Sequence, residues 1–286
     1  MKILVVGGSG YIGSRLIPYL SQWHSVSNYD LTHGEDVRNT PLLRKFCSDK
    51  DVVIYLASLS NNDMCNRSQD LARSINQQAF PGVLQIIKDC SVGRFIYASS
   101  AAAYGDKENA TELNELKPTT KYGEGKAYCE GELKNLAYTE IPYVVTRCAS
   151  VCGYSPRMRY DLMVNRMIRD AAEKGIIAVN GGEQIRSHIH INDVCRFYRY
   201  LLDAKKVEYE AFNVVAENLS VMDTAVRVSR VLGDIKIDVR PYTDNRSYSV
   251  SGEKAKEILG FKPLYSVNHA VVENYLNTLY DYRSPG

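Results

Sequence analysis

The sequence predicts an α/β fold in which a doubly wound parallel sheet is covered on both faces by helices, followed by a smaller α/β region. Two observations support this prediction. Short, almost continuously apolar segments alternate with longer amphipathic segments over the first half of the chain. A glycine-rich stretch lies between the first apolar segment and the first amphipathic one. The second half is less regular, and the pattern changes near residue 150.

Five apolar segments of the first half are predicted as strands. Segments that are apolar on both faces are typical of a parallel sheet buried between two layers of helices. The second segment is the weakest of the five because serine and asparagine interrupt it. The segments are KILVVG (2–7), SVSNYD (25–30), DVVIYLA (51–57), RFIYASS (94–100) and IPYVVTR (141–147).

The segments between these strands are predicted as helices. Pro18 and Pro81 fall inside two of them. An interior proline costs about 3 kcal/mol and kinks a helix, so we expect a bend or a break at each position. The predicted helices cover residues 11–22, 40–49, 67–90 and 122–138.

The second half predicts a second set of elements. A helix over residues 161–175 has Gly175 as its C-cap, and a helix over 220–233 has Ser220 as its N-cap and Gly233 after its end. The remaining predicted elements are a strand leading into a helix over 185–204, a strand over 211–216 and a final helix over 266–280.

The bulk properties exclude several classes of protein. The 286 residues are enough for one large domain or two modest ones, and the formal net charge is +2 without a run of like charges. A general nucleic-acid or anionic-membrane role is therefore not indicated. No apolar stretch is long enough to span a bilayer, and the N-terminus lacks the features of a secretory signal. The seven scattered cysteines indicate reduced thiols of a cytoplasmic protein, with neither a disulfide framework nor a metal site.

The stretch VVGGSGYIGSRL (5–16) joins the first strand to the first helix. Its glycines fit both G-x-G-x-x-G and G-x-x-G-x-x-G, which allow a tight turn and a close approach of the backbone to a pyrophosphate. The helix N-terminus adds free N–H groups and a partial positive charge. We therefore predict a dinucleotide site that includes Gly7, Gly10, Tyr11, Ile12 and Gly13.

Asp30 ends the second strand, at about the spacing expected for a carboxylate that binds the adenosine ribose 2′-hydroxyl. A carboxylate there would repel a 2′-phosphate, so NAD is favoured over NADP. The alternative is a glycine turn that binds no ligand beside a solvated Asp30.

Tyr122 and Lys126 lie four residues apart in a predicted helix, so they share one face. The charge of Lys126 can lower the pKa of Tyr122. Ser99 and Ser100 end a strong strand, at the edge where a doubly wound sheet binds its ligand, and Ser100 could hydrogen-bond the same substrate oxygen. For the tyrosine–lysine pair alone, a solvated helix face is the alternative.

Five segments together resemble the extended short-chain dehydrogenase/reductases, in their NAD-dependent nucleotide-sugar epimerase/dehydratase branch. The segments are GGSGYIG, DVVIYLAS, FIYASSAAAYGD, YGEGK and RSHIHINDV, and the resemblance covers most of the chain. It implies a Rossmann-type domain over residues 1–150, to which about 186–215 return, and a mainly substrate-binding domain over 151–286. It also implies that Tyr122 is the general acid/base, that Lys126 depresses its pKa and holds the nicotinamide ribose, and that Ser100 positions the reacting oxygen.

The resemblance assigns further positions. Asp36 and Val37 resemble the segment that contacts the adenine, and Asn76 resembles a helix asparagine near the active site, with a helix-surface amide as its alternative. Leu56, Ala57, Ser58 and Ser99 correspond to strand ends beside the cofactor.

Other positions resemble the substrate side of the family. Arg186 resembles the arginine that binds the substrate diphosphate, a role that suits a guanidinium group. Asn165 and Arg246 are candidates for the same pocket, with surface positions as the alternative. His188 and His190 alternate along a predicted strand and are expected to pack or hydrogen-bond rather than to bind a metal.

The chain also departs from the family pattern. Only Leu31–His33 separate Asp30 from the segment GEDVRN, where many members have a longer loop, so we expect a more open adenosine end. Family members that are dehydratases have a pattern like S-T-D-E-x-Y-G here, in which the Asp and the Glu act as acid and base. This chain has Ala101 and Ala102 at those two positions, which disfavours dehydration and decarboxylation. The segment SPRMRYDL (155–162) resembles a subgroup of epimerases and C4 dehydrogenases.

The main hypothesis is an NAD-dependent nucleotide-sugar epimerase that transiently oxidises a sugar carbon, C4. One alternative is an NAD(P)-dependent nucleotide-sugar 4-dehydrogenase or 4-keto-sugar reductase of the same fold. Another is a non-catalytic dinucleotide-binding protein, because a fold does not determine a function. The resemblance further implies a nucleotide-diphosphate sugar as substrate. It also implies a homodimer in which the helices carrying Asn76 and Tyr122 form a four-helix bundle.

Overall fold

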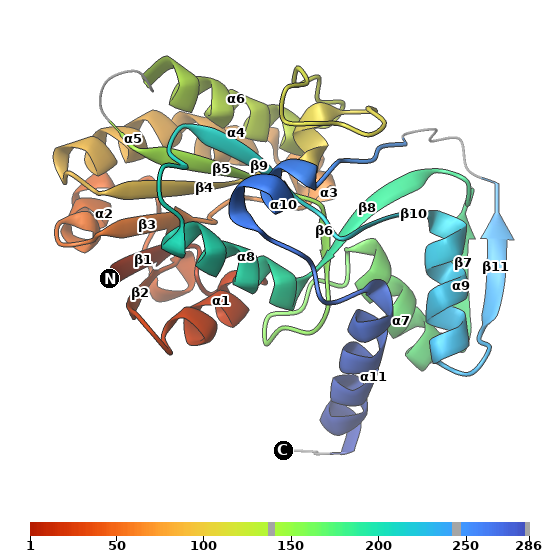
Figure 1. Cartoon of the computed structure of the whole chain (residues 1–286). Helices are drawn as coiled ribbons and strands as arrows, with labels where there is room; N and C mark the ends of the chain where they lie inside the picture. The colour runs from red at the N-terminus through yellow and green to blue at the C-terminus, as the bar shows by residue number, and fades with distance from the viewer. Residues whose placement is uncertain (137–140, 242–246, 284–286) are drawn as a thin grey trace.

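The computed structural model describes residues 1–136, 141–241 and 247–283 (Figure 1). Its largest element is a six-stranded sheet in which every neighbouring pair of strands is parallel. The order across the sheet is β2 (Ser25–Tyr29), β1 (Lys2–Val6), β3 (Val52–Tyr55), β4 (Arg94–Ser100), β5 (Tyr143–Cys148) and β9 (Glu210–Val214). From β1 the chain adds β2 on one side and then adds β3, β4, β5 and β9 in turn on the other side. The strand order therefore reverses between β1 and β3. In such sheets ligands bind outside the carboxyl ends of the strands at that point.

Helices cover both faces of this sheet. Alternate residues of β1 point to opposite sides, so Ile3 packs in one core cluster and Leu4 in the other. The first cluster is closed by α1 (Gly13–Leu20) and α8 (Ile191–Asp203). The second is closed by α2 (Thr40–Cys47), α5 (Phe80–Asp89) and α6 (Lys121–Leu136). The predicted doubly wound sheet is confirmed.

Two smaller sheets lie beyond the carboxyl ends of the large sheet (Figure 1). In the first, β8 (Ile185–His190) pairs in parallel with β6 (Ser150–Cys152) and antiparallel with β10 (Glu217–Ser220). In the second, β7 (Ile176–Asn180) pairs with β11 (Lys236–Arg240). A separate core cluster joins them to α7 (Met163–Lys174), α9 (Val221–Val231) and α11 (Val267–Arg283). Between β8 and β10 the chain returns to the large sheet as α8 and β9.

The two prolines behave differently. The predicted helix over 67–90 is broken, as expected, into α4 (Gln69–Arg73), a π-helical turn η2 (Ser74–Gln78) and α5, with Pro81 in the first turn of α5. A proline in a first turn lacks an N–H that has no partner there in any case. No break occurs at Pro18, where a bend or a break was expected, because α1 continues through it to Leu20. Pro18 lies on the exposed side of α1 near its end, so few helical hydrogen bonds depend on it.

The predicted caps are confirmed. The Ser220 hydroxyl accepts the N–H of Asp223 at the start of α9, and Gly175 ends α7 in the left-handed conformation with φ +65°. Several elements were missed, namely α3 (Asn62–Arg67), β6, β7, β10, β11 and α10 (Glu253–Leu259). These are short, from three to seven residues, and tertiary pairing rather than local propensity stabilises them. Among the described residues, no helix is both long and apolar enough to cross a membrane.

Candidate active site

A cavity of about 860 Å³ opens where the strand order reverses. Most of the cofactor and catalytic residues predicted from the sequence line it, although they come from widely separated parts of the chain. They are Gly7, Gly10, Tyr11, Ile12, Gly13, Asp30, Asp36, Val37, Leu56, Ala57, Ser58, Ser99, Ser100, Tyr122 and Lys126.

The glycine loop shows why side chains are excluded there. Gly7 has φ +85°, and a Cβ on it would lie 2.6 Å from the backbone nitrogen of Ala57. A Cβ on Gly13 would lie 2.5 Å from the Cα of Gly8. A Cβ on Gly10 would meet only the Gly7 carbonyl, at 3.3 Å, and Gly10 lines the cavity. The loop therefore packs tightly against β3 and leaves a cradle at Gly10 that fits the pyrophosphate of a dinucleotide.

The adenosine end of the cavity is acidic. Asp30 accepts the N–H of Ser9 at 3.0 Å through one carboxylate oxygen and the N–H and hydroxyl of Thr32 at 2.9 Å through the other. Glu35, which the sequence reading missed, also lines the cavity and accepts the N–H of Asp30 at 2.7 Å. Asp36 pairs with Arg38, which lowers the pKa of the Asp36 carboxyl. Carboxylates at this end fit a ribose with a free 2′-hydroxyl, as in NAD.

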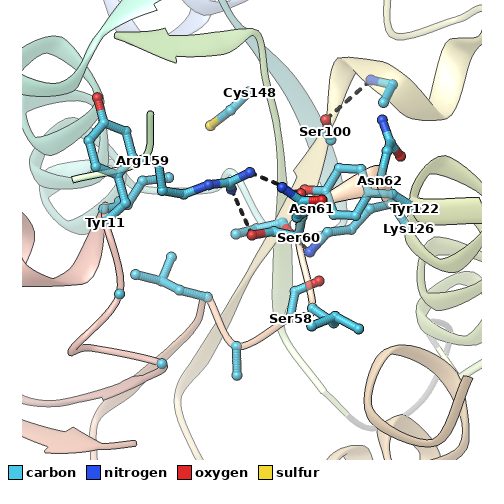
Figure 2. Close-up of a pocket in the computed structure, with 18 of the residues that line it drawn as sticks. Tyr11, Ser58, Ser60, Asn61, Asn62, Ser100, Tyr122, Lys126, Cys148 and Arg159 are labelled. Atoms are coloured by element: carbon cyan, nitrogen blue, oxygen red, sulfur yellow. Dashed lines mark hydrogen bonds between the residues drawn. The ribbon is translucent and has the colours of Figure 1, made fainter. Parts of the chain in front are cut away.

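The predicted catalytic set comes from two adjacent elements. Tyr122 and Lys126 lie one turn apart on α6, and Ser100 is the last residue of β4. The Lys126 Nζ donates to the carbonyl oxygen of Ala98 at 2.6 Å and lies 5.6 Å from the centre of the Tyr122 ring. Figure 2 shows Ser100, Tyr122 and Lys126 on one side of the cavity, with Arg159 reaching in from the other side, where Tyr11 also lies.

Burial dominates the electrostatics of this set. It raises the pKa of Tyr122 to about 12, against the charge of Arg159 and a hydrogen bond with Ser100, which both lower it. Burial likewise lowers the pKa of Lys126 to about 8. The sequence led us to expect Lys126 as the charge that lowers the pKa of Tyr122. In the structure Arg159 makes the largest lowering contribution, because its guanidinium enters the same cavity.

Arg159 lies in the segment 153–162 and was not assigned from the sequence. Its guanidinium donates to the hydroxyl of Ser60 at 2.7 Å and to the carbonyl of Ser60 at 3.2 Å (Figure 2). It also pairs with Asp161, which accepts from the side-chain amide of Asn61 at 2.9 Å. The segment SPRMRYDL resembles a subgroup pattern, but no local feature of the sequence assigns a role to its second arginine, Arg159.

Asn76 lies outside the lining of the cavity, in the π-helical turn η2. The side-chain oxygen of Asn76 accepts the N–H of Leu59 at 2.8 Å and the hydroxyl of Ser58 at 3.2 Å. Its amide nitrogen donates to the Leu59 carbonyl at 2.9 Å. The structure therefore places Asn76 behind the loop that follows β3, which its side chain holds at Ser58 and Leu59, rather than in the cavity as expected. π-Helical turns are frequent at functional sites.

Asn165 is 1% exposed and lines neither cavity. Its side-chain nitrogen donates to the Tyr11 hydroxyl at 3.1 Å and to the Arg159 carbonyl at 3.2 Å, and its side-chain oxygen accepts the N–H of Gly153 at 3.2 Å. Tyr11 in turn donates to the Gly153 carbonyl at 2.6 Å. Instead of facing a substrate, as expected, Asn165 ties the segment of Arg159 to the glycine loop.

A second cavity of about 340 Å³ adjoins the first and shares Ala102, Asp161 and Tyr248 with it. Arg186 lines this cavity, with its guanidinium 5.4 Å from the centre of the Tyr248 ring. Arg166 lines it as well and was missed, because nothing in the sequence separates it from other arginines of an amphipathic helix. Two guanidinium groups suit an anionic ligand such as a diphosphate. Arg246, predicted for the same pocket, lies outside the described residues.

The remaining predictions concern residues without a catalytic role. Ala102 lines both cavities and Ala101 is buried, so the two positions offer no acid or base. His188 is buried, which lowers its pKa to about 4, and His190 stacks on Tyr265 with ring centres 5.0 Å apart. Over the described ranges, no group of three or more His, Cys, Asp or Glu side chains could hold a metal ion.

Comparisons with known proteins bear on the family and the fold of the chain. The model of the NAD dependent epimerase/dehydratase family matches residues 3–215. The low-salt glycan biosynthesis protein Agl12 of Haloferax volcanii is 25% identical over 310 residues, covering 96% of this chain and 99% of the relative. The N-acetyl-alpha-D-glucosaminyl-diphospho-ditrans,octacis-undecaprenol 4-epimerase of Escherichia coli O157:H7 is 25% identical over 286 residues, covering 90% and 85%.

Among solved structures, a UDP-glucuronic acid 4-epimerase from Bacillus cereus in complex with UDP-glucuronic acid and NAD superposes with a TM-score of 0.88. It shares 25% sequence identity, over 98% of this chain and 100% of that chain. The glycine cradle, the acidic adenosine end and the Ser100–Tyr122–Lys126 set thus occur in a chain whose similarity to the family extends over almost its whole length. The chain belongs to the NAD dependent epimerase/dehydratase family.

Proposed function

We propose that this enzyme epimerises a nucleotide-diphosphate sugar by oxidising and re-reducing one sugar carbon, C4. The observation that supports this reaction is the set of Ser100, Tyr122 and Lys126 in the same cavity as the glycine loop. Ala102 lines that cavity where a dehydratase would need a carboxylate for a second carbon. Chemistry confined to one carbon is therefore favoured. Relatives and structural neighbours named as 4-epimerases support the choice of C4.

In this mechanism Tyr122 accepts the proton of the C4 hydroxyl as phenolate, while Ser100 hydrogen-bonds the same oxygen. Burial raises the pKa of Tyr122; the charge of Arg159 opposes this, and the positive nicotinamide of NAD would favour the phenolate further. NAD held by the glycine loop and the acidic adenosine end would supply the acceptor and, on its return, the donor of the C4 hydride. Rotation of the 4-keto sugar presents its other face before the return, and Tyr122 then gives the proton back to the new hydroxyl. Lys126 is held by the Ala98 carbonyl beneath Tyr122, and its position suits the nicotinamide ribose. Proton transfer of this kind contributes about 10²–10⁴-fold to the rate.

The second cavity supplies the binding site for the nucleotide diphosphate. Arg186 and Arg166 line it from β8 and α7, next to the catalytic cavity. Their charges would bind the diphosphate, while the sugar extends past Ala102 towards Tyr122. Only interactions that are stronger in the transition state accelerate the reaction, so these two arginines serve affinity more than turnover.

The proposed enzyme is a cytoplasmic homodimer. Helix α4, from the segment predicted as the helix of Asn76, packs against α6, and the two helices expose Leu71 and Tyr128, whose exposed fractions are 42% and 40%. These side chains could contact the same helices of a second copy in a four-helix bundle. All seven cysteines are free, which suits a reducing compartment. Light scattering should give twice the mass of the chain, and a monomer mass would contradict the dimer.

The function is tested in two steps. Mass spectrometry first identifies any dinucleotide that the purified protein releases on denaturation. NMR then follows UDP- and dTDP-linked sugars incubated with the enzyme, with and without added NAD. We expect retained NAD and formation of the 4-epimer without net change in cofactor. Turnover that consumes added NAD(P) stoichiometrically would instead identify a dehydrogenase or reductase. Retained NAD without turnover of any nucleotide sugar would indicate a non-catalytic protein.

A further inference from the structure

A buried ion pair lies beneath the catalytic set and has no part in the mechanism above. Glu130 on α6 and Arg147 on β5 are each 1% exposed. The Arg147 Nη2 lies 2.7 Å from one carboxylate oxygen of Glu130, and Nε lies 3.1 Å from both oxygens. The pair is therefore bidentate and fully removed from water.

Glu130 stands on the catalytic face of its helix. Tyr122, Lys126 and Glu130 follow one another at intervals of four residues, so they form one row along α6. The Glu130 carboxylate also accepts the hydroxyl of Ser99 at 2.5 Å. Successive residues of a strand point to opposite sides, so this bond at Ser99 helps to set the direction of Ser100.

Arg147 contacts Tyr104, at the other end of the segment that begins with Ser99. Ser100 is followed by the 3₁₀ turn η3 (Ala101–Tyr104), and the Arg147 Nη1 donates to the Tyr104 hydroxyl at 2.6 Å. The guanidinium also lies over the Tyr104 ring, 4.9 Å from its centre. The ion pair thus contacts the residue directly before Ser100 and the end of the turn directly after it.

The contact between α6 and this turn leaves little space beside Tyr122. A Cβ on Gly123 would lie 2.6 Å from the Ala102 carbonyl oxygen. A small shift of α6 along the turn would therefore change the distance between the hydroxyls of Tyr122 and Ser100. A buried ion pair is not needed for stability alone, because well-packed apolar residues of similar size are often equally stabilising. What the charged pair adds is a fixed direction for each hydrogen bond.

We propose that Glu130 and Arg147 are positioning residues that hold Ser100 and Tyr122 at the separation required for proton transfer. This proposal rests on the proposed epimerase function. The ion pair is expected to act on turnover rather than on binding, because neither Glu130 nor Arg147 lines either of the two cavities described above.

The test replaces both charges by apolar side chains, in Glu130→Leu/Arg147→Met. The matched control is Arg94→Met/Glu208→Leu, which removes an ion pair of 2.6 Å that involves the opposite end of β4. We expect kcat of the first variant to fall by about a hundredfold, as for a misplacement of about 1 Å. KM and bound NAD should stay close to those of the wild type, and the control should keep its kcat. An unchanged kcat in the first variant, or an equal loss in the control, would overturn the proposal.

A second pair of variants covers the case in which the double variant does not fold. Ser99→Ala removes one hydroxyl from the network, and Ser99→Thr keeps it. We expect kcat to fall by about tenfold in the alanine variant, which corresponds to about 1.4 kcal/mol in the barrier, and to recover in the threonine variant. Equal kcat in Ser99→Ala and the wild type would contradict the proposal. A wild-type enzyme that converts no nucleotide sugar would instead refute the proposed function.

Discussion

The two regions of the molecule place their polar side chains in different ways. In the six-stranded layer, Ser100 ends a strand, and Tyr122 and Lys126 lie one turn apart on the helix beside it. In the second region, Arg159 and Asp161 reach back to Ser60 and Asn61, which are about a hundred positions earlier in the sequence. The first arrangement depends on local geometry, and the second depends on how the two regions pack.

The difference suggests that the two sets of side chains affect different steps of the reaction. Substitutions in the local set should act on the chemical step, because those side chains contact the reacting atoms in the proposed mechanism. Substitutions in the long-range set should act on substrate affinity, because they displace a segment that lines both cavities. The predictions below test this division, beginning with the largest expected effect.

Tyr122→Phe should lower kcat by about a thousandfold, because it removes the group that exchanges the proton. The ring and its packing remain, so bound NAD and the melting temperature should change little. NMR turnover assays measure kcat, mass spectrometry of the released dinucleotide measures bound NAD, and thermal unfolding measures the melting temperature. Turnover within tenfold of the wild type would show that another group carries the proton.

Lys126→Met should separate activity from stability. Burial lowers the pKa of Lys126 to about 8, and each pKa unit corresponds to about 1.4 kcal/mol, so the buried charge costs about 3 kcal/mol near neutral pH. The variant also loses the hydrogen bond to the Ala98 carbonyl, which contributes about 1 kcal/mol. We therefore expect the free energy of unfolding at pH 7 to rise by about 2 kcal/mol. The variant should nevertheless lose most of its activity.

The pH dependence has a definite sign. Between pH 8 and the unfolded pKa of about 10.4, the unfolded chain holds the Lys126 proton and the native protein does not, so the wild type gains stability as pH rises. The stability advantage of Lys126→Met should therefore shrink over this window. Urea unfolding of both proteins at pH 7 and pH 10 measures it. A difference that does not depend on pH would contradict the buried charge.

Asn165→Ala should affect the long-range set. It removes the bonds that join the Arg159 carbonyl to the Tyr11 hydroxyl, so we expect KM for the nucleotide sugar to rise by about tenfold with a smaller change in kcat. Asn277→Ala, which removes a side-chain bond within α11, is the control and should leave both parameters unchanged. A loss confined to kcat would place Asn165 with the chemical residues and weaken the comparison.

Asp30→Ser/Glu35→Gln should act on the choice of cofactor. Removing both carboxylates relieves the repulsion of a 2′-phosphate, so we expect the ratio of NADP to NAD affinity to rise by about tenfold. Asp30→Ser alone should have a smaller effect, because Glu35 remains in the cavity lining. Fluorescence titration with NADPH and NADH measures the ratio. An unchanged ratio in the double variant would mean that these carboxylates do not select the cofactor.

The sequence by itself determined the parallel sheet, the glycine loop and the grouping of Ser100, Tyr122 and Lys126 at one edge. These features depend on short periodicities, in which apolar strands, a glycine turn and a helical repeat of four residues each set the local geometry. The placement of Asp30 at a strand end followed from the same local rules.

Only the tertiary structure decided the other features. Asn165 and Arg159 contact Tyr11 and Ser60 because β6 and α7 pack against the carboxyl ends of the large sheet, and the small sheets form through pairing rather than propensity. The Glu130–Arg147 pair likewise forms between a helix and a strand, across residues that are 17 positions apart in the sequence. Such contacts join residues distant in sequence, and their geometry is set by the packing of whole elements, which local patterns do not encode.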